Sequence, residues 1–542
     1  MMNFQRILHG GAVLLAAFLV CPSSLPLQAA EPLTATAQRP LEQEAAKGVD
    51  AGLMQSVDKN APVPAIVDDA TFFRRIYFDL AGKPPPHDEI LNFTSDRDPE
   101  KRRKQIDRLL ASEDYAINWG RYWRDVVTYH TPASANYLRW QLFDNWLVDN
   151  VRRNRPFNEI VTALVTATGV NDECAPVNYL TAQFGNPVEI AATTSRVFLG
   201  VQLQCAQCHD SKLDSWKREQ FHELVAFFGR ARLIQHKDVS GRGTPYAIEG
   251  REDGQYCMTD LSDPNRLIPM KPRFLTGEEI SAAAGDAERR AALARFITSP
   301  KNPRFARAYV NRIWTSLMGW GFYPTVNDLG SGQSPQYGAV LDRLAQEWIA
   351  SGYDMRWLFR TLAQTEAYQR GLQPLPSSSA GAVPAVCPSR LRPEQIFDAL
   401  ARVLGFNEND KTIPAPAPSS APAVARHNGL RHMVYQAFRV DPSTPVEEVQ
   451  GTIPQALLLM NSAVVNRSIA ANGKTFLADA LAKGKSDEEI LSAFYEQILA
   501  RKPKPEELEI CRHYLKRIGD RKEALEDVYW SLVNSTEFLS KR

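Results

Sequence analysis

The strongest chemical signature in the chain is the run Cys205-Ala206-Gln207-Cys208-His209. Two cysteines three positions apart, followed at once by a histidine, form the attachment signature of c-type haem. The two thiols can each form a thioether to a vinyl group of the haem, and the histidine can bind the iron as its proximal ligand. The spacing therefore predicts one covalent haem c, attached to Cys205 and Cys208 and ligated by His209.

Other interpretations of the cysteine pair remain open. In an oxidising compartment the pair can close as a disulfide or exchange disulfides with other thiols. A zinc site needs about four ligands and would have to recruit Cys257, His222 or His236. No sixth iron ligand can be identified, because Met258, Met270, His222 and His236 all fit ordinary core or surface roles.

The segments on both sides of the motif are expected to be helical. Asn186-Pro187 with Glu189 is a typical helix start, because asparagine caps, proline fits the first position and an acid favours the first turn. This helix is expected to run to about Gln204 and to present the motif at its end. A second helix is expected from Ser215. Its apolar side chains could form a wall of the haem site, although the core is the favoured place for them: Trp216, Phe221, Leu224, Val225 and Phe228.

Other residues with possible chemistry are few. Asp210 and Asp214 flank the motif and could act as general acid and base on a bound substrate. Helix capping is the favoured role, with Asp214 just before the second helix. The sequence has no G-x-S-x-G, H-E-x-x-H, Walker or G-x-G-x-x-G pattern. Four tryptophans could hold a sugar, although their helical spacing favours the core: Trp119, Trp123, Trp140 and Trp146.

The first 30 residues have the three parts of a secretory signal peptide. Arg6 precedes the apolar run 10–20, and small residues lead to Ala30. Cys21 is not expected to carry a lipid, because the preceding Phe-Leu-Val supplies no small residue. No later segment reaches the roughly 18 apolar residues of a spanning helix. We therefore expect an exported protein, periplasmic or secreted, with no transmembrane segment after signal removal.

Composition limits the class of partner. The chain has 542 residues, with 63 basic and 62 acidic side chains. Arg6 is the only one of these in residues 1–30, so the remainder is balanced at 62 against 62. This balance gives no electrostatic reason to expect nucleic acid or an anionic membrane as a partner. The apolar share of 44% is ordinary for a globular protein and excludes a wholly disordered chain.

The apolar periodicity predicts a mainly α fold of two helical regions joined by an irregular connector. Six cysteines remain after signal removal, and the four outside the motif (Cys174, Cys257, Cys387 and Cys511) allow three pairings. Proline, alanine and serine dominate two stretches, and this composition predicts exposed linkers. The expected organisation is a loose leader at 31–67, a helical domain with the motif at 68–232, the connector at 233–300, and a helical domain at 301–542 with linkers at 374–388 and 414–425.

Several short runs occur in a fixed order along the chain. In the first half they are FRRIYFDLAG at 73–82, DRLLAS at 107–112, YWRD at 122–125 and RVFLGVQLQ at 196–204. In the second half they are NPRFAR at 302–307, VNRIW at 310–314, GYD at 352–354, PQAL at 454–457 and NSTEF at 534–538. In this order they resemble the large exported proteins of planctomycetes that carry a DUF1549 region, also called planctomycete cytochrome type 2, followed by a DUF1553 region.

This resemblance implies an exported, c-type-cytochrome-like protein with haem attached to Cys205 and Cys208 and iron ligated by His209. The chain departs from the family in two ways. Members usually continue C-H-D-H-P-F-D, whereas Asp210 is followed here by Ser211, so the second histidine is absent. The separate N-terminal cytochrome domain of many members is also missing, so we expect one haem.

The leading hypothesis is electron transfer, or service as the redox subunit of a larger assembly, with a partner protein that the sequence does not name. Two alternatives belong to other classes. One is a non-haem binding or scaffold protein in which Cys205 and Cys208 form a disulfide. The other is an enzyme that acts on a polysaccharide or another polymer, with the tryptophans as a platform and Asp210 or Asp214 in acid–base roles. Whether the chain is an enzyme is open.

Overall fold

A computed structural model of the chain describes residues 35–541 with internal gaps. The expected signal peptide and the expected linker at 414–425 lie outside the described residues, as do residues 374–381 of the other linker. Within the described residues the fold is mainly α, as predicted. The gaps are at 133–134, 136, 213, 237–243, 331–333, 374–381, 407–428 and 446–447.

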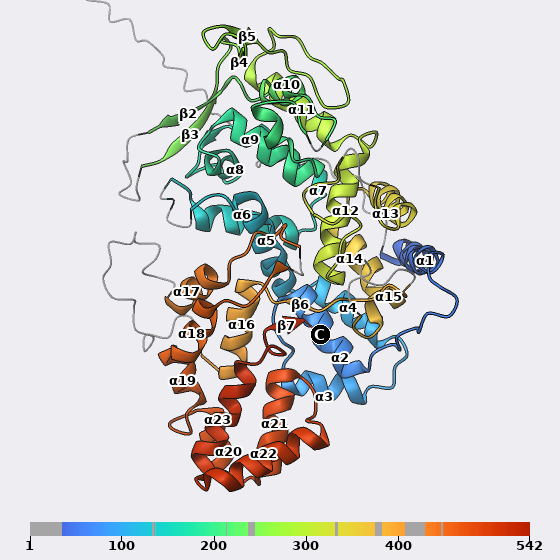
Figure 1. Ribbon diagram of the computed structural model, residues 1–542, viewed down its shortest axis with the longest axis vertical. Helices are drawn as coiled ribbons and strands as arrows, with labels where there is room; N and C mark the ends of the chain where they lie inside the picture. The colour runs from blue at the N-terminus through green and yellow to red at the C-terminus, as the bar shows by residue number, and fades with distance from the viewer. Residues whose placement is uncertain are drawn as a thin grey trace, which may run out of the picture.

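Two hydrophobic cores organise the described helices (Figure 1). The larger core is formed by helices from the first part of the chain, and the smaller core by helices α16 to α23. The packing therefore changes near residue 390, so the first helices of the expected second domain pack into the larger core. None of the described helices is long and apolar enough to cross a membrane.

The larger core contains fifteen α-helices and three shorter helical turns. The turns are π-helical at Tyr77–Ala81 and Ser195–Leu199 and 3-10 at Leu203–Gln207. The helices are α1 (Ala35–Met54), α2 (Asp69–Ile76), α3 (His87–Ser95), α4 (Lys101–Leu110), α5 (Glu113–Thr128), α6 (Trp140–Arg152), α7 (Phe157–Thr166), α8 (Val177–Ala182), α9 (Pro187–Thr194), α10 (Arg218–Val225), α11 (Asp286–Thr298), α12 (Pro303–Met318), α13 (Gly338–Ala350), α14 (Met355–Gln364) and α15 (Glu366–Gln369).

The smaller core lies at the lower end of the view in Figure 1. Its helices are α16 (Pro393–Leu404), α17 (Gly429–Phe438), α18 (Ile453–Asn461), α19 (Ala463–Ile469), α20 (Phe476–Ala482), α21 (Asp487–Leu499), α22 (Pro505–Ile518) and α23 (Arg521–Val533). Phe78 of the larger region packs into the smaller core, and Ala500 packs into the larger one. The two cores are therefore in direct contact.

Short antiparallel strands complete the fold. β1 (Gly169–Val170), β3 (Tyr246–Gly250) and β2 (Ala231–Gln235) form one sheet in that order. β4 (Cys257–Thr259) pairs with β5 (Leu267–Pro269). β6 (Ser389–Arg390) pairs with β7 (Ser540–Lys541), which places the C-terminal strand at the junction of the two cores.

The structure corrects the expectation of a loose leader at 31–67. Residues Ala35–Met54 form helix α1, which packs on α13 and α14. Ala45, Val49 and Leu53 recur every fourth position and are buried in the larger core. This spacing puts the three side chains on one face of a helix, and their burial fixes the segment.

The expected irregular connector at 233–300 is only partly irregular. It contains β3, β4 and β5, and it ends in helix α11, which packs on α7. Arg290 and Asp286 of α11 form a fully buried ion pair, with 2.5 Å between Nη2 and Oδ2. Arg290 also donates to the carbonyl oxygens of Val165 and Ala167 and so joins α11 to the end of α7.

The expected linker at 374–388 is not exposed in its second part. Val383, Ala385 and Val386 are buried, because the segment crosses the end of α12. The indole nitrogen of Trp320 donates to the Ala385 carbonyl oxygen at 2.9 Å, and the Cys387 amide donates to the Met318 carbonyl oxygen. A few apolar residues and two backbone contacts therefore outweigh the proline-rich composition.

Candidate functional site

The motif Cys205–His209 follows helix α9, whose start agrees with the prediction. The Asn186 side chain caps the helix by accepting from the Val188 amide at 3.0 Å, and Pro187 is the first helical residue. The helix does not reach Gln204 as expected. It ends in a π-helical turn and then at Gly200, whose φ is +61°.

Gly200 explains why the helix stops. A side chain in this left-handed conformation would be strained, and its Cβ would lie 2.5 Å from Leu329 Cγ. Glycine at this place is a typical helix C-cap. The motif is therefore carried by the separate 3-10 helix Leu203–Gln207 and by Cys208, which follows it.

Both motif cysteines are exposed and carry free thiols. Leu203 and Ala206 of the same turn are buried in the larger core and hold it against the protein. Side chains three positions apart eclipse one another in a 3-10 helix. Cys205 lies in this 3-10 helix and Cys208 directly follows it, and the structure does not join them in a disulfide.

His209 is exposed, and its tautomer follows from its hydrogen bond. Nδ1 lies 2.7 Å from the backbone carbonyl oxygen of Asp210. A carbonyl oxygen only accepts, so Nδ1 carries a proton, and in the neutral ring Nε2 is then the nitrogen with the lone pair. This is the hydrogen-bonding arrangement that orients a metal-binding histidine.

Asp210 has the capping role that the sequence suggested for Asp214. Its carboxylate accepts from the Arg218 amide at 2.9 Å and lies 3.0 Å from Lys217 Nζ. The hydrogen bond from the Arg218 amide and the one from Lys217 lower the pKa of this exposed carboxyl. Helix α10 begins at Arg218 rather than at Ser215, and Asp210 binds its first turn.

The side chains beneath the motif that could bind a metal already have hydrogen-bond partners in the protein. His222 Nε2 is 3.0 Å from the Gln207 carbonyl oxygen, and its Nδ1 is 2.8 Å from the Tyr256 hydroxyl. Burial lowers the pKa of His222. Met258 Sδ accepts from Arg218 at 3.5 Å. Both ring nitrogens of His222 thus position the turn, and neither is turned towards a ligand.

The remaining predicted candidates fall into two groups. The aromatic residues of the α10 region are buried core as expected, and so are Trp119 and Trp123 of α5. Met270 is also buried, whereas His236 is partly buried. Among the residues that the structure describes, no three His, Cys, Asp or Glu side chains are arranged to hold a metal ion.

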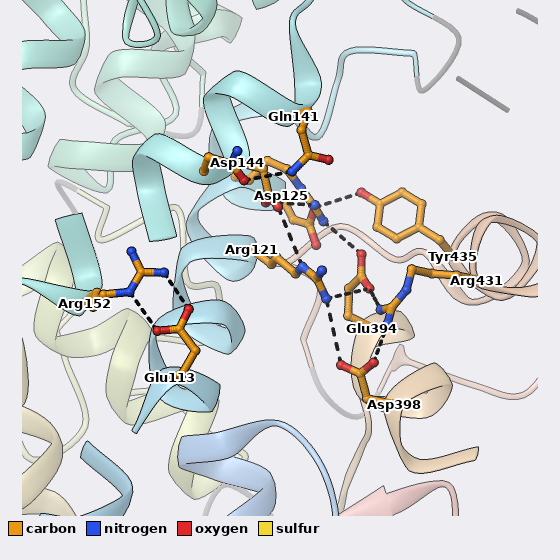
Figure 2. A network of polar contacts seen from close by, with 12 residues as sticks. Glu113, Arg121, Asp125, Gln141, Asp144, Arg152, Glu394, Asp398, Arg431 and Tyr435 are labelled. Atoms are coloured by element: carbon orange, nitrogen blue, oxygen red, sulfur yellow. Dashed lines mark hydrogen bonds and ion pairs between the residues drawn. The ribbon is translucent and has the colours of Figure 1, made fainter. Parts of the chain in front are cut away.

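Sequence reasoning missed a network of buried charges between the two cores (Figure 2). Arg121 and Arg124 of α5 face Glu394 of α16, with Arg124 Nη2 3.2 Å from Glu394 Oε1. Arg431 of α17 reaches the same carboxylate at 2.5 Å. Asp144 of α6 accepts from Arg124 at 3.1 Å. Arg124 belongs to the run YWRD at 122–125, which contributes to the family resemblance. No signal in the sequence indicates that Arg124 contacts residue 394.

Glu394 is the centre of this network. Burial alone would raise the pKa of Glu394, but Arg124, Arg121 and Arg431 together lower it to about 2. Burial raises the pKa of the neighbouring Asp398, although Arg431 lies 2.6 Å away. The three guanidinium groups thus favour the charge on Glu394 more than the charge on Asp398.

Comparison with protein-family models identifies both halves of the chain. Residues 48–232 match a family described as a protein of unknown function (DUF1549). Residues 289–515 match a family described as a protein of unknown function (DUF1553). Comparison with curated proteins and with solved structures finds no match.

Proposed function

Because this chain belongs to the proteins that carry a DUF1549 domain followed by a DUF1553 domain, we propose its function from its own residues. It is an exported protein that carries one covalent haem c and transfers electrons to a partner protein. Cys205 and Cys208 hold the haem by thioethers, and His209 is the proximal ligand. The basic and apolar N-terminal segment, which is typical of a signal peptide, supports export to the periplasm or beyond.

The observation that carries this proposal is the hydrogen bond from His209 Nδ1 to the Asp210 carbonyl oxygen. It leaves Nε2 as the nitrogen with a free lone pair, which is the form that binds iron. The same turn exposes the thiols of Cys205 and Cys208, so all three functional groups are accessible from solvent. Asp210 and Lys217 fix the position of this turn relative to helix α10.

The donor set fits a haem better than it fits a bare metal ion. Thioether attachment needs two accessible thiols, because each sulfur bonds to a vinyl carbon while the proton goes to the other carbon of that double bond. It does not need the thiols and the histidine to converge on one metal atom, and in the described residues they do not. Bound haem would supply one-electron redox chemistry.

The exposed position of the motif favours electron transfer over catalysis on a buried substrate. Cys205, Cys208 and His209 are all exposed, so a partner protein could approach a haem held there directly. Solvent exposure is one of the factors that set the potential of such a centre. The buried residues Leu203 and Ala206 keep this exposed turn rigid.

The test is the absorption spectrum and intact mass of protein exported from a host with cytochrome c maturation machinery. We expect a Soret band and a mass gain of one haem. The Cys205→Ser/Cys208→Ser double variant should lose both, whereas the control Cys257→Ser, at a half-buried cysteine of β4, should keep both. His209→Ala should keep some attached mass but change the spectrum. Colourless wild-type protein of bare polypeptide mass would overturn the proposal.

A further inference from the structure

A cavity of about 150 Å³ lies where the two cores meet, between elements that include α5, α12 and α17 (labelled in Figure 1). Its walls come from α5 and α12 of the larger core, from the β6 segment and α17, and from Lys541 of β7. It is remote in sequence from the cysteine motif and shares no lining residue with it. A cavity of this size accommodates a molecule as large as a benzene ring.

The lining combines aromatic rings with positive charge. Five basic and two acidic side chains face the cavity. The aromatic residues are Trp119, Tyr122, Tyr129, Tyr435 and Phe438. The basic residues are Arg312, Arg390, Arg392, Arg439 and Lys541, and the acidic residues are Asp125 and Asp441.

Three of the seven charged side chains have partners in the protein that stabilise their charge. Lys541 Nζ lies 2.5 Å from Asp79 Oδ1. Asp125 is bound by Arg124 at 2.8 Å. Asp441 accepts from the amide and the hydroxyl of Ser443. These contacts leave four arginines against the one remaining carboxylate, Asp441, so positive charge is in excess by three (five basic minus two acidic side chains).

No carboxylate of the described residues lies within ion-pair distance of any of these four arginines. They contact neutral oxygens instead: Arg312 donates to the Asn327 side chain, Arg392 to the Asn118 side chain, Arg390 to the Gln455 side chain and Arg439 to the Tyr129 carbonyl. Arg392 also lies over the rings of Trp119 and Tyr122. Burial lowers the pKa of Arg390 and of Arg392, although Asp125, Asp79 and Glu394 act on Arg392 in the opposite direction.

Arg312 is the most informative of the four. It is only 2% exposed, and its Nε and Nη1 have no hydrogen-bond partner in the described part of the chain. Arg439 Nε is likewise buried and without a partner. Buried charges in proteins are normally paired. The arginines of the adjacent network follow that rule, since Arg121 and Arg124 each contact two or more carboxylates.

We propose that this cavity binds a small organic oxyanion with a ring-sized body. The oxyanion, a carboxylate, sulfonate or phosphate group, pairs with the guanidinium groups of Arg312 and Arg439, which line the cavity. The ring packs against Trp119, Tyr122 and Phe438. The residues come from both halves of the chain, so the ligand also joins the DUF1549 and DUF1553 regions.

The experiment is a titration of the full chain at constant ionic strength, followed by thermal unfolding. The probes are benzoate, benzenesulfonate and phenyl phosphate, with neutral benzyl alcohol, inorganic sulfate and inorganic phosphate as comparisons. A ligand that binds the native state raises the melting temperature as its concentration rises above Kd. We expect at least one ring-bearing anion to do so, and we expect benzyl alcohol and the inorganic ions to have no comparable effect.

Variants identify the site. Arg312→Met breaks no ion pair, so the variant should fold, and it should weaken anion binding by about tenfold or more, as loss of a charge-assisted hydrogen bond predicts. Arg439→Met should weaken it as well. Arg153→Met, at an arginine whose side chain is 75% exposed, is the control and should bind as the wild type does.

Three results would overturn the proposal. They are no stabilisation by any ring-bearing anion, equal stabilisation by benzyl alcohol or the inorganic ions, and unchanged binding in both the Arg312→Met and Arg439→Met variants. None of these readouts involves the Soret band or the mass of attached haem. Failure here is therefore distinguishable from failure of the proposed haem attachment.

Discussion

Replacing Glu394 with glutamine should destabilise the contact between the two cores. In the native protein this carboxylate lies 2.5 Å from Arg431, 3.2 Å from Arg124 and 3.7 Å from Arg121. Glutamine preserves the shape of the side chain and removes its charge. Three guanidinium groups would then share the remaining carboxylates of the network (Figure 2).

The magnitude follows from proton linkage. The pKa of Glu394 falls from the ordinary 4.5 to about 2 in the folded protein, which corresponds to about 3 kcal/mol of stability at neutral pH. Because the folded pKa is the lower one, this contribution is complete above pH 4.5 and is lost as the pH falls towards 2. Loss of one partner from a buried ion pair costs about 3 to 5 kcal/mol by an independent rule. Both arguments predict a loss of about 3 kcal/mol at pH 7.

Asp398 supplies the matched control, since it lies one helical turn further along α16 and shares Arg431 with Glu394. Burial raises its pKa, so the fold disfavours its charge, and Asp398→Asn should change stability by less than about 1 kcal/mol. The assay is urea unfolding of both variants and the wild type at pH 7, with the free energy taken from the midpoint and slope. Equal losses in the two variants would refute the assignment of Glu394 as the centre of the network.

Two further predictions concern other buried groups. Lys541→Met should cost about 3 to 5 kcal/mol, because it leaves the 1% exposed Asp79 without its cation; the control Lys522→Met, at an exposed lysine, should change the melting temperature little. Burial lowers the pKa of His222 below 6.5, so the unfolded chain binds the proton more readily and stability should fall as the pH drops below about 6.5. Melting temperatures measured at pH 7.5 and pH 5.5 should show this loss in the wild type and a smaller one in His222→Gln.

Local sequence signals predicted the start of α9, but they predicted neither its end nor the start of α10. The start of α9 at Pro187 depends on Asn186 next to it, and α16 likewise has a proline, Pro393, as its first residue. The end of α9 depends on Gly200, whose Cβ position is occupied by Leu329, a residue far along the chain. Helix α1 was not predicted because it is stabilised by burial against α13 and α14, which lie far along the chain.

The cysteine motif was recognisable because its residue types occur in five consecutive positions. The conformation of the turn that carries the motif could not be predicted from the sequence. Cys205 and Cys208 were expected at the end of a long helix, but they lie on a separate 3-10 turn. The capping role belongs to Asp210, because α10 begins at Arg218 and the carboxylate of Asp210 accepts from the Arg218 amide. The hydrogen bond that sets the tautomer of His209 likewise depends on this backbone path.

The arginine cavity could not be predicted from the sequence. Its basic residues run from Arg312 to Lys541 and come from different elements, and the balanced net charge conceals their convergence. A buried arginine can be assigned to ligand binding or to structural support only when the structure shows whether a carboxylate neutralises its charge. Arg124 and Arg312 illustrate the difference. The first is surrounded by Asp125, Asp144 and Glu394, whereas the second, among the described residues, donates a hydrogen bond to Asn327 and pairs with no carboxylate. The same residue type thus stabilises the junction in one place and is available for an anionic ligand in the other.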